Sequence, residues 1–479
     1  MASAHLTTRG LDALLSDWRG EASAYESLAD RIRLLILDGR IGIDVRLPAE
    51  RDLAEHLELS RTTVASAYRR LRELGFASSV RGSGTLTRLP ALAPVLHLPA
   101  GPDVLDFTKA ALPATVLLPD AVRAASENLP GYLGDTGYDP VGLPVLREAI
   151  ARRYTERGLP TEPDEVLVTV GAQQAIALVA RALIARGDRA LIEAPTYPHA
   201  HETLAAAGAR LVAVPVSTQT HDGWDADELL NALRRTSPAL AYVMPEFQNP
   251  TGRTMSAEIR GLLLAAAAAQ GTIVVADETP GELDIDRPGE FKPLAAYNDD
   301  AGAQVLMIGS ASKTMWGGLR IGWLRAERGL IRKLAAVRAG IDLGSPILEQ
   351  LVVAQLLPQS PQIVEERRSQ LRAGRDSIQA AVSQRFPEWT IPVVQGGLAV
   401  WLNIGVPLSS HLALAARGHG LMITAGPRFG IDGAFERFLR MPLTYSPEAV
   451  DRAVVALTRS WPALARTPYP DLGELGAVV

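Results

Sequence analysis

The residue with the clearest chemical potential is Lys313, one of only four lysines in a chain that carries 48 lysines and arginines in all. Ser310 and Ser312 precede it, and Arg320 follows it in a glycine-rich segment. A desolvated lysine can lose its proton and form an imine, whereas an arginine cannot. The hydroxyls and the arginine therefore indicate a site for an aldehyde that also carries a phosphate. The alternative is a surface lysine in a glycine-rich loop.

Four further motifs supply groups that such a ligand would need. Gly171, Ala172 and Gln173 open a helix after a predicted strand, where free backbone N–H groups bind phosphate. Tyr197 follows the next strand and has a ring that can stack on a planar ligand, and Asn249 supplies an amide at a turn. Taken singly, the glycine turn is an ordinary connection and Tyr197 is a core tyrosine.

The fourth motif is Asp277, which ends the apolar run 273–276. A carboxylate at the carboxyl end of a parallel strand lies where ligands bind in open α/β sheets. There it can pair with a protonated ring nitrogen and keep the ring an electron sink.

The elements that must position these residues follow an α/β pattern. Short apolar runs alternate with helical patterns after residue 104, which predicts a mostly parallel, buried sheet. The predicted strands are 166–170, 189–193, 210–215, 239–244, 272–276 and 304–308. The most apolar stretch, 261–276, is too short to span a bilayer and predicts an alanine-rich helix followed by a strand.

In this order, the motifs resemble those of fold type I pyridoxal-phosphate enzymes, specifically class I aminotransferases, over about residues 105–460. The resemblance implies that Lys313 forms the internal aldimine and that Asp277 holds the ring nitrogen. It implies that Asn249 binds the ring hydroxyl and that Tyr197 stacks on the ring. It also implies a phosphate site formed by Gly171, Ala172, Gln173, Ser310, Ser312 and Arg320.

The same resemblance implies two roles outside the cofactor ring. Tyr138 resembles the tyrosine that reaches a neighbouring subunit's phosphate, and Arg440 the arginine that binds a substrate α-carboxylate. One position departs from the family pattern, because Thr279 stands where a tyrosine usually donates to the ring oxygen. We therefore expect Thr279 to contact the cofactor but efficient transamination to be impaired.

The first part of the chain has a different pattern, which predicts a winged helix-turn-helix. Apolar residues at helical spacing predict a helix over 25–38, and Pro48 is expected to begin a second one. Ser60 is a good N-cap for a third helix, which Gly75 ends. Segments 76–80 and 85–89 then form a hairpin, the wing.

The charge of this unit favours DNA as its partner. Residues 60–88 contain six arginines and one acidic residue, although the whole chain has a net charge of −5. Ser60, Arg61, Thr62 and Thr63 would meet base edges and phosphates in a major groove. Arg51 on the preceding helix and the predicted wing tip, Arg81, Gly82 and Ser83, would add contacts to the DNA. The alternative is a basic helix in a protein–protein module.

The helix-turn-helix segment resembles the GntR family of bacterial repressors. The resemblance rests on Leu-Pro-Ala-Glu-Arg-Asp-Leu-Ala at 47–54, Ser-Arg-Thr-Thr-Val at 60–64 and Tyr68, Leu71, Leu74 and Gly75. A GntR-like unit joined to an aminotransferase-like unit resembles MocR-type regulators. The implied organisation is an N-terminal extension (1–24), the DNA-binding domain (25–88), a linker (89–104) and the cofactor-binding domain (105–479), with a large part at about 130–345 and a smaller C-terminal α+β part at about 370–465.

This resemblance implies transcriptional control of an operator in double-stranded DNA. The large domain would sense pyridoxal phosphate, or an amino compound, through the aldimine at Lys313, and a homodimer would present two DNA-binding heads. Two alternatives remain: an active aminotransferase with an accessory head, and a dimerisation scaffold that no longer binds the cofactor. The absence of cysteine excludes disulfides and thiolate metal sites. We expect a soluble cytoplasmic protein with no metal site and no membrane partner.

Overall fold

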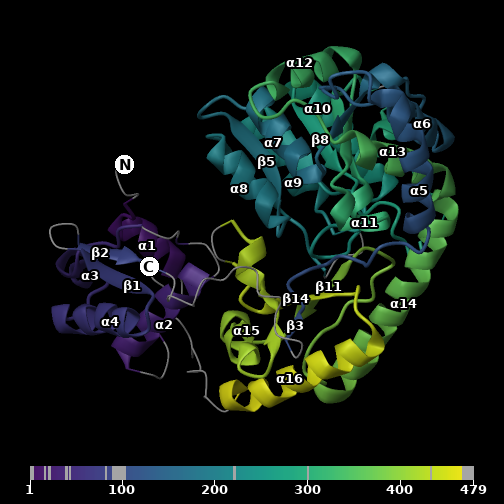
Figure 1. The fold of residues 1–479 in the computed structure, drawn as a ribbon. Helices are drawn as coiled ribbons and strands as arrows, with labels where there is room; N and C mark the ends of the chain where they lie inside the picture. Colours follow the sequence, from purple (N-terminus) through teal and green to yellow (C-terminus); the bar gives the residue numbers. More distant parts are fainter. Residues whose placement is uncertain are drawn as a thin grey trace.

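The computed structural model describes residues 5–15, 18–19, 23–37, 41, 45–80, 84–88, 104–218, 223–287, 289–298, 301–431 and 434–465. These residues form three parts, a DNA-binding head, a large lobe built on a sheet, and a small lobe (Figure 1). The predicted wing tip, Arg81, Gly82 and Ser83, and the predicted linker up to residue 103 lie outside the described residues.

The head contains four helices and one antiparallel hairpin. Its elements are α1 (Thr8–Leu15), α2 (Ala24–Leu37), α3 (Glu50–His56), α4 (Arg61–Glu73), β1 (Ala77–Val80) and β2 (Gly84–Thr87). The predicted hairpin and the predicted start of the third helix are confirmed, because Ser60 caps α4 by accepting a hydrogen bond from the Thr63 N–H. Helix α3 begins at Glu50 rather than at Pro48, since Ala49 has an extended backbone.

The hydrophobic core of the head includes residues from the segment 1–24, which is predicted from the sequence to be an extension outside the DNA-binding domain. Leu11 and Leu15 of α1 are fully buried against the same cluster as Leu28, Val64 and Tyr68. The Tyr68 hydroxyl donates to the Pro48 carbonyl at 3.0 Å and so ties α4 to the segment that leads into α3. Part of the predicted N-terminal extension therefore belongs to the head.

The large lobe is built on a seven-stranded sheet with the order β4-β10-β9-β8-β7-β5-β6. The strands are β4 (Val166–Thr169), β5 (Arg189–Ala194), β6 (Arg210–Pro215), β7 (Leu240–Val243), β8 (Ile273–Asp277), β9 (Val305–Ser310) and β10 (Gly322–Arg325). The predicted parallel sheet is confirmed, with β10 as its antiparallel member.

Helices cover both faces of this sheet (Figure 1). They are α5 (Leu118–Asn128), α6 (Pro144–Glu156), α7 (Ala172–Leu183), α8 (Pro198–Ala206), α9 (Ala226–Thr236), α10 (Ala257–Gln270), α12 (Arg328–Arg338) and α13 (Ile347–Leu356). Strands β4, β7 and β9 are buried along their whole length, which is why their sequences are continuous apolar runs. None of the described helices is long and apolar enough to cross a membrane.

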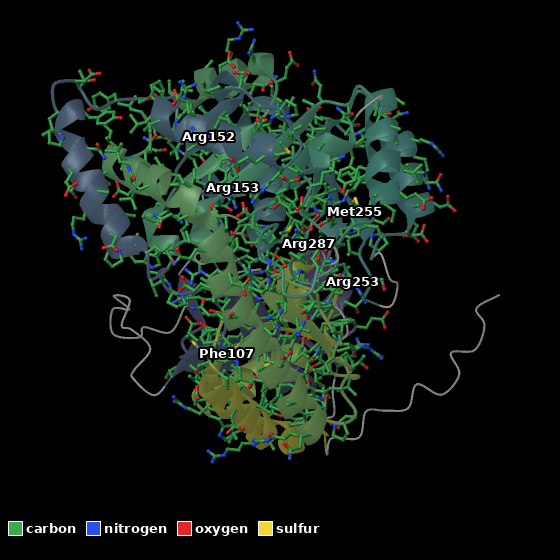
Figure 2. The ribbon with its side chains drawn as sticks, turned by 90° about the vertical axis from the view of Figure 1, so that its right-hand side faces the viewer. Phe107, Arg152, Arg153, Arg253, Met255 and Arg287 are labelled. Carbon is green, nitrogen blue, oxygen red and sulfur yellow. The ribbon has the colours of Figure 1, made fainter. Side chains whose placement is uncertain are left out.

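The small lobe packs two long helices against a three-stranded antiparallel sheet. Its elements are α14 (Ser360–Arg385), β11 (Ala399–Asn403), α15 (Ser409–Arg417), β12 (Leu421–Met422), β13 (Thr424–Ala425), β14 (Phe438–Pro442) and α16 (Pro447–Ala465). Strand β3 (Leu105–Asp106) pairs with β12, and Phe107, which follows β3, is labelled in Figure 2. The Phe107 ring stacks on Tyr445 with 4.1 Å between the ring centroids. The chain thus enters this lobe before it builds the large one.

Candidate functional site

A cavity of about 450 Å³ is lined by half of the predicted cofactor residues and by the predicted carboxylate-binding Arg440. Its walls come from both lobes, and Lys313, Asp277, Asn249, Tyr197 and Arg440 all line it. The residues reach one place because β7, β8 and β9 run parallel, so that the segments after them meet at the same edge of the sheet. The volume is in the range of small-molecule and cofactor sites.

Lys313 lies in the short helix α11 (Ala311–Thr314), which directly follows β9. Its Nζ donates to the Ala110 carbonyl at 3.0 Å. Burial, reinforced by the charge of Arg440, lowers the pKa of the Lys313 amine to about 8, although Asp277 opposes this shift. A large share of the amine is therefore neutral near pH 8, which is the nucleophilic form.

Asp277 ends β8 and is buried, with two donors on its carboxylate. The Tyr242 hydroxyl donates to Oδ2 at 2.7 Å, and the Thr279 N–H donates to Oδ1 at 3.0 Å. Burial, reinforced by the Asp277 charge, raises the pKa of Tyr242 well above its usual value, so the phenol stays a donor. Sequence analysis missed Tyr242, whose only signal is one hydroxyl in the apolar run of β7.

A group of predicted phosphate residues meets where β4 and β9 end and β10 begins. Arg320 has φ 52° and donates to the Val170 carbonyl at 3.2 Å. A Cβ added to Gly171 would lie 2.8 Å from the Arg320 guanidinium, so only glycine leaves room for that arginine. Ser310 accepts from the Ser312 N–H at 3.1 Å, which leaves the Ser312 hydroxyl beside Lys313.

The remaining predicted cofactor residues differ in where they lie. Ala172 lines the cavity at the start of α7, but the Gln173 amide turns away from it and donates to Thr203 at 3.0 Å. Thr279 lines the cavity as well. Tyr138 does not, because its side chain is on the surface and 69% exposed.

Arg440 reaches the cavity from β14 of the small lobe. It donates to the Thr108 carbonyl, and its guanidinium carbon lies 5.1 Å above the Phe429 ring. Burial lowers the pKa of Arg440 to about 10, which leaves it charged at neutral pH. A buried, charged guanidinium with unused donors is a site for a carboxylate.

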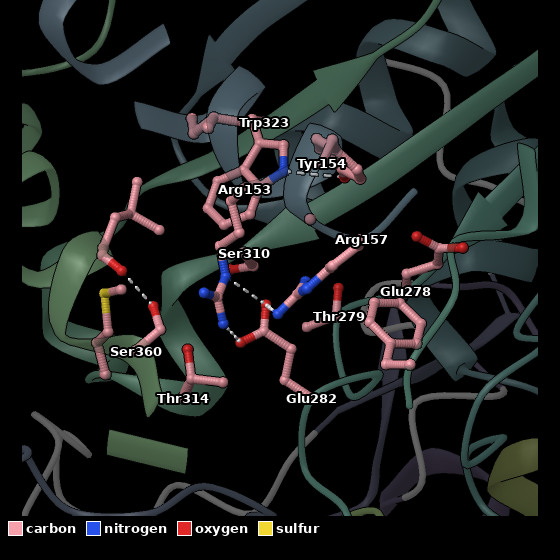
Figure 3. Close-up of a pocket in the computed structure, with 15 residues that line it drawn as sticks. Arg153, Tyr154, Arg157, Glu278, Thr279, Glu282, Ser310, Thr314, Trp323 and Ser360 are labelled. Carbon is pink, nitrogen blue, oxygen red and sulfur yellow. Dashed lines mark hydrogen bonds and ion pairs between the residues drawn. The ribbon is translucent and has the colours of Figure 1, made fainter. Parts of the chain in front are cut away.

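A second, smaller cavity of about 30 Å³ lies behind Thr279 and Ser310. Figure 3 shows Arg153 and Arg157 both directed at Glu282 in its wall. Burial opposes ionisation, but the two arginines lower the pKa of Glu282 to about 2. Thr279 lines both cavities, and the smaller cavity has room for about one water molecule.

The predicted DNA-contacting residues form an exposed surface on the head. Arg51 on α3 and Arg61 and Thr62 at the start of α4 are exposed, whereas Tyr68 on the opposite face of α4 is buried. The Ser60 hydroxyl lies 2.7 Å from the hydroxyls of both Thr62 and Thr63. The N-terminal turn of α4 thus presents its arginine and hydroxyls to solvent, as a groove-reading helix must.

The head contacts the small lobe through Arg31 of α2. Its guanidinium lies 2.5 Å from the Glu436 carboxylate, and the two side chains are 7% and 16% exposed. Glu436 also accepts hydrogen bonds from Ser409 and Ser410 at the start of α15. Glu436 lies two residues before β14, the strand that carries Arg440. One short segment therefore connects the head to the cavity.

Comparison with known proteins assigns both units. Residues 109–457 match the family of class I and II aminotransferases, and residues 24–86 match the gntR family of bacterial regulatory proteins. The chain belongs to the class I and II aminotransferase family. With the GntR-type head in front, it has the architecture of the MocR-type regulators.

Similar proteins include both regulators and enzymes. The chain is 26% identical to the uncharacterized HTH-type transcriptional regulator YdfD of Bacillus subtilis, over 88% of this chain and 92% of the relative. It is 28% identical to the probable rhizopine catabolism regulatory protein MocR of Rhizobium meliloti, over 85% and 87%. It is also similar to the crystal structure of the α-aminoadipate aminotransferase LysN of Thermus thermophilus, at 30% identity, a TM-score of 0.69 and coverage of 76% and 93%.

Pyridoxal phosphate is the cofactor of this aminotransferase family, and the cavity fits it. Three buried polar atoms around Lys313 have no partner among the residues that the structure describes: Ser312 Oγ, Thr279 Oγ1 and Arg440 Nε. Burying such atoms without a partner is costly, so they indicate a bound polar ligand. The cofactor supplies an aldehyde and an electron-withdrawing ring. This chain would hold it with the Lys313 amine, the Asp277 carboxylate and donors for the phosphate.

Proposed function

We propose that this chain is a transcription regulator that holds pyridoxal phosphate at Lys313 and responds to the cofactor or to an amino compound. The composition of the cavity supports this proposal. The Lys313 amine with its lowered pKa, the Asp277 carboxylate and Arg440, whose Nε has no hydrogen-bond partner among the described residues, line one cavity. The same chain has a GntR-type head. We assign the imine to Lys313 and the ring nitrogen to Asp277. Asn249 and Thr279 contact the ring substituents, Tyr197 stacks on the ring, and Arg440 binds an effector carboxylate.

We assign binding of the cofactor phosphate to the residues at the carboxyl ends of β4 and β9. Gly171 and Ala172 offer backbone donors at the start of α7, while Ser310, Ser312 and Arg320 offer side chains. We place Gln173 at the edge of this group, because its amide is held by Thr203. On the head, Arg51, Ser60, Arg61, Thr62 and Thr63 are our DNA-contacting residues, with Arg81, Gly82 and Ser83 of the wing.

The Arg31–Glu436 ion pair links the DNA-binding head to the segment that leads to Arg440 in the cavity. An effector carboxylate on Arg440 acts on β14, and the ion pair that docks the head stands directly before that strand. Any effector that binds the docked and released arrangements with different affinity shifts the balance between them. Arg31 and Glu436 are therefore the expected coupling residues.

Arg31→Ala should uncouple the head from the effector site. We expect the effector to perturb the absorbance of the holoprotein as in wild type, but to change operator affinity much less. Arg33→Ala, on the same helix and paired with Asp30, is the matched control. Fluorescence anisotropy of labelled operator with and without effector measures the effect. An unchanged effector response in the Arg31 variant would contradict the link.

We also propose a homodimer, which gives exposed Tyr138 a partner. Asp139 next to it packs against Gly344, and Leu343 in that loop is 56% exposed. Exposed apolar side chains gathered in adjoining loops are typical of an interface. The dimer would place two heads on two half-sites.

Sedimentation of the full-length holoprotein tests the dimer. Wild type should sediment as a dimer at micromolar concentration. Leu343→Asp should shift it toward monomer, because the charge would be buried in the interface. Val393→Asp, at an exposed position of the small lobe, is the control. A wild-type monomer with cofactor bound would refute the proposal.

A second candidate function is that of a working aminotransferase, which the similarity to the 2-aminoadipate transaminase of Thermus thermophilus favours, at 29% identity over 79% of this chain. Thr279 opposes it, because a threonine stands where the family pattern has a tyrosine that donates to the ring oxygen. Multiple turnovers at about one per second or faster with an amino acid and a keto acid would establish this function instead.

A further inference from the structure

We infer that the cavity selects an amino compound with a second acidic group, and that Arg428 binds that group. The inference rests on the proposed function, in which Arg440 takes the first carboxylate. Arg428 lies in the 3₁₀ turn Gly426–Phe429 and lines the same cavity as Arg440. The two arginines differ in depth, because Arg440 is buried whereas the Arg428 side chain is 24% exposed.

The present partner of Arg428 is a carboxylate of the protein itself. Its Nη1 forms an ion pair with Glu202, and the other oxygen of Glu202 lies 3.0 Å from His199 Nδ1. Burial opposes ionisation of Glu202, but Arg428 and His199 lower its pKa. Arg428 and His199 thus already form a carboxylate-binding pair, with Glu202 in the place that a ligand would compete for.

That ion pair can be exchanged for a ligand at little cost. Glu202 is 43% exposed, and ion pairs so open to solvent contribute little to stability. The Nε and Nη2 atoms of Arg428 form no hydrogen bond within the described part of the chain, so the guanidinium has donors left for a ligand. His199 lines the cavity as well and offers another donor.

The other charges of the cavity do not serve a second acid. The Lys109 side chain is 74% exposed, so its ammonium stays solvated beside Asp106. Lys313 is assigned to the cofactor, and Asp277 is acidic. Met244, Phe247 and Leu398 supply apolar walls for an aliphatic chain. The ligand class that uses both arginines is an amino acid with a terminal carboxylate, sulfonate or phosphonate.

Paired probes that differ only in the distal charge test this inference. We would add L-glutamate, L-glutamine, L-aspartate and L-asparagine to the full-length holoprotein and follow its visible absorbance. The acids should bind roughly tenfold more tightly than their amides, as expected for a charge-assisted hydrogen bond. Arg428→Gln should abolish the preference without weakening the amides, and Arg428→Lys should retain part of it.

Glu202→Gln provides the opposite change. Removing the internal competitor should tighten binding of the acids and leave the amides unaffected. Equal binding of acid and amide by wild type, or a preference that survives in Arg428→Gln, would overturn the inference alone. A holoprotein whose absorbance responds to none of these probes nor to other amino compounds would overturn amino-compound sensing, and the inference with it.

Discussion

Replacing Lys313 by alanine should abolish the visible absorbance of the holoprotein completely. The band requires an imine, and Lys313 is the amine that the cavity presents beside Asp277 and Arg440. Lys333→Ala, at an exposed position of α12, should leave the band intact. Borohydride reduction of wild type should attach the cofactor to the peptide that contains Lys313, which mass spectrometry can verify. An unchanged spectrum in Lys313→Ala would contradict the assignment.

The lowered pKa of Lys313 adds a pH dependence to this result. The neutral amine is the reactive form, and its fraction rises as the pH passes through about 8. Cofactor-free protein mixed with pyridoxal phosphate should therefore develop the band faster as the pH rises through that value, with a plateau above it. A rate that still climbs steeply toward pH 10.5, the usual pKa of a lysine, would show that the amine is not desolvated.

Arg61→Ala should weaken operator binding by about 1–3 kcal/mol if the side chain makes a bidentate base contact. Arg61 is the first residue of α4, exposed, and held at the helix start by the Ser60 cap. Arg123→Ala, an exposed arginine of the large lobe, is the control. Wild-type affinity should also fall steeply with salt, because phosphate contacts release counterions.

The salt dependence separates the two roles of Arg61. Loss of a phosphate contact lowers the slope of log affinity against log salt by about one and weakens all sequences alike. Loss of a base contact leaves that slope unchanged and weakens the preference for one base at a single operator position. An Arg61→Ala variant with the operator affinity, salt dependence and sequence preference of wild type would refute the placement of the recognition helix.

Local signals explain what the sequence predicts well. Ser60 marks the start of α4 because its hydroxyl caps the helix, and Gly75 follows its end with φ 78°. The buried parallel strands stand out as apolar runs, and Asp277 stands out because it ends one of them. Such features depend on residues close together in the sequence, so they can be predicted without knowing the tertiary structure.

Features set by tertiary contacts could not be predicted in the same way. Strand β10 begins with Gly322 in a glycine-rich segment, and it becomes a strand only because β4 and β9 flank it. The Tyr242 hydroxyl donates to Asp277 on the adjacent strand, and Arg31 pairs with Glu436, which is 405 residues away in the sequence. Arg428 likewise joins the cavity through the small lobe, far from Lys313 in the sequence.

If the proposed function holds, the occupancy of the cavity controls DNA binding by the head. Footprinting on the DNA that flanks the chain's own gene tests it most directly, with cofactor-free protein, with pyridoxal phosphate and with an added amino compound. We expect a protected operator whose pattern or affinity changes with the ligand in wild type and does not change in Lys313→Ala. Protection that is identical under all three conditions in wild type would contradict it.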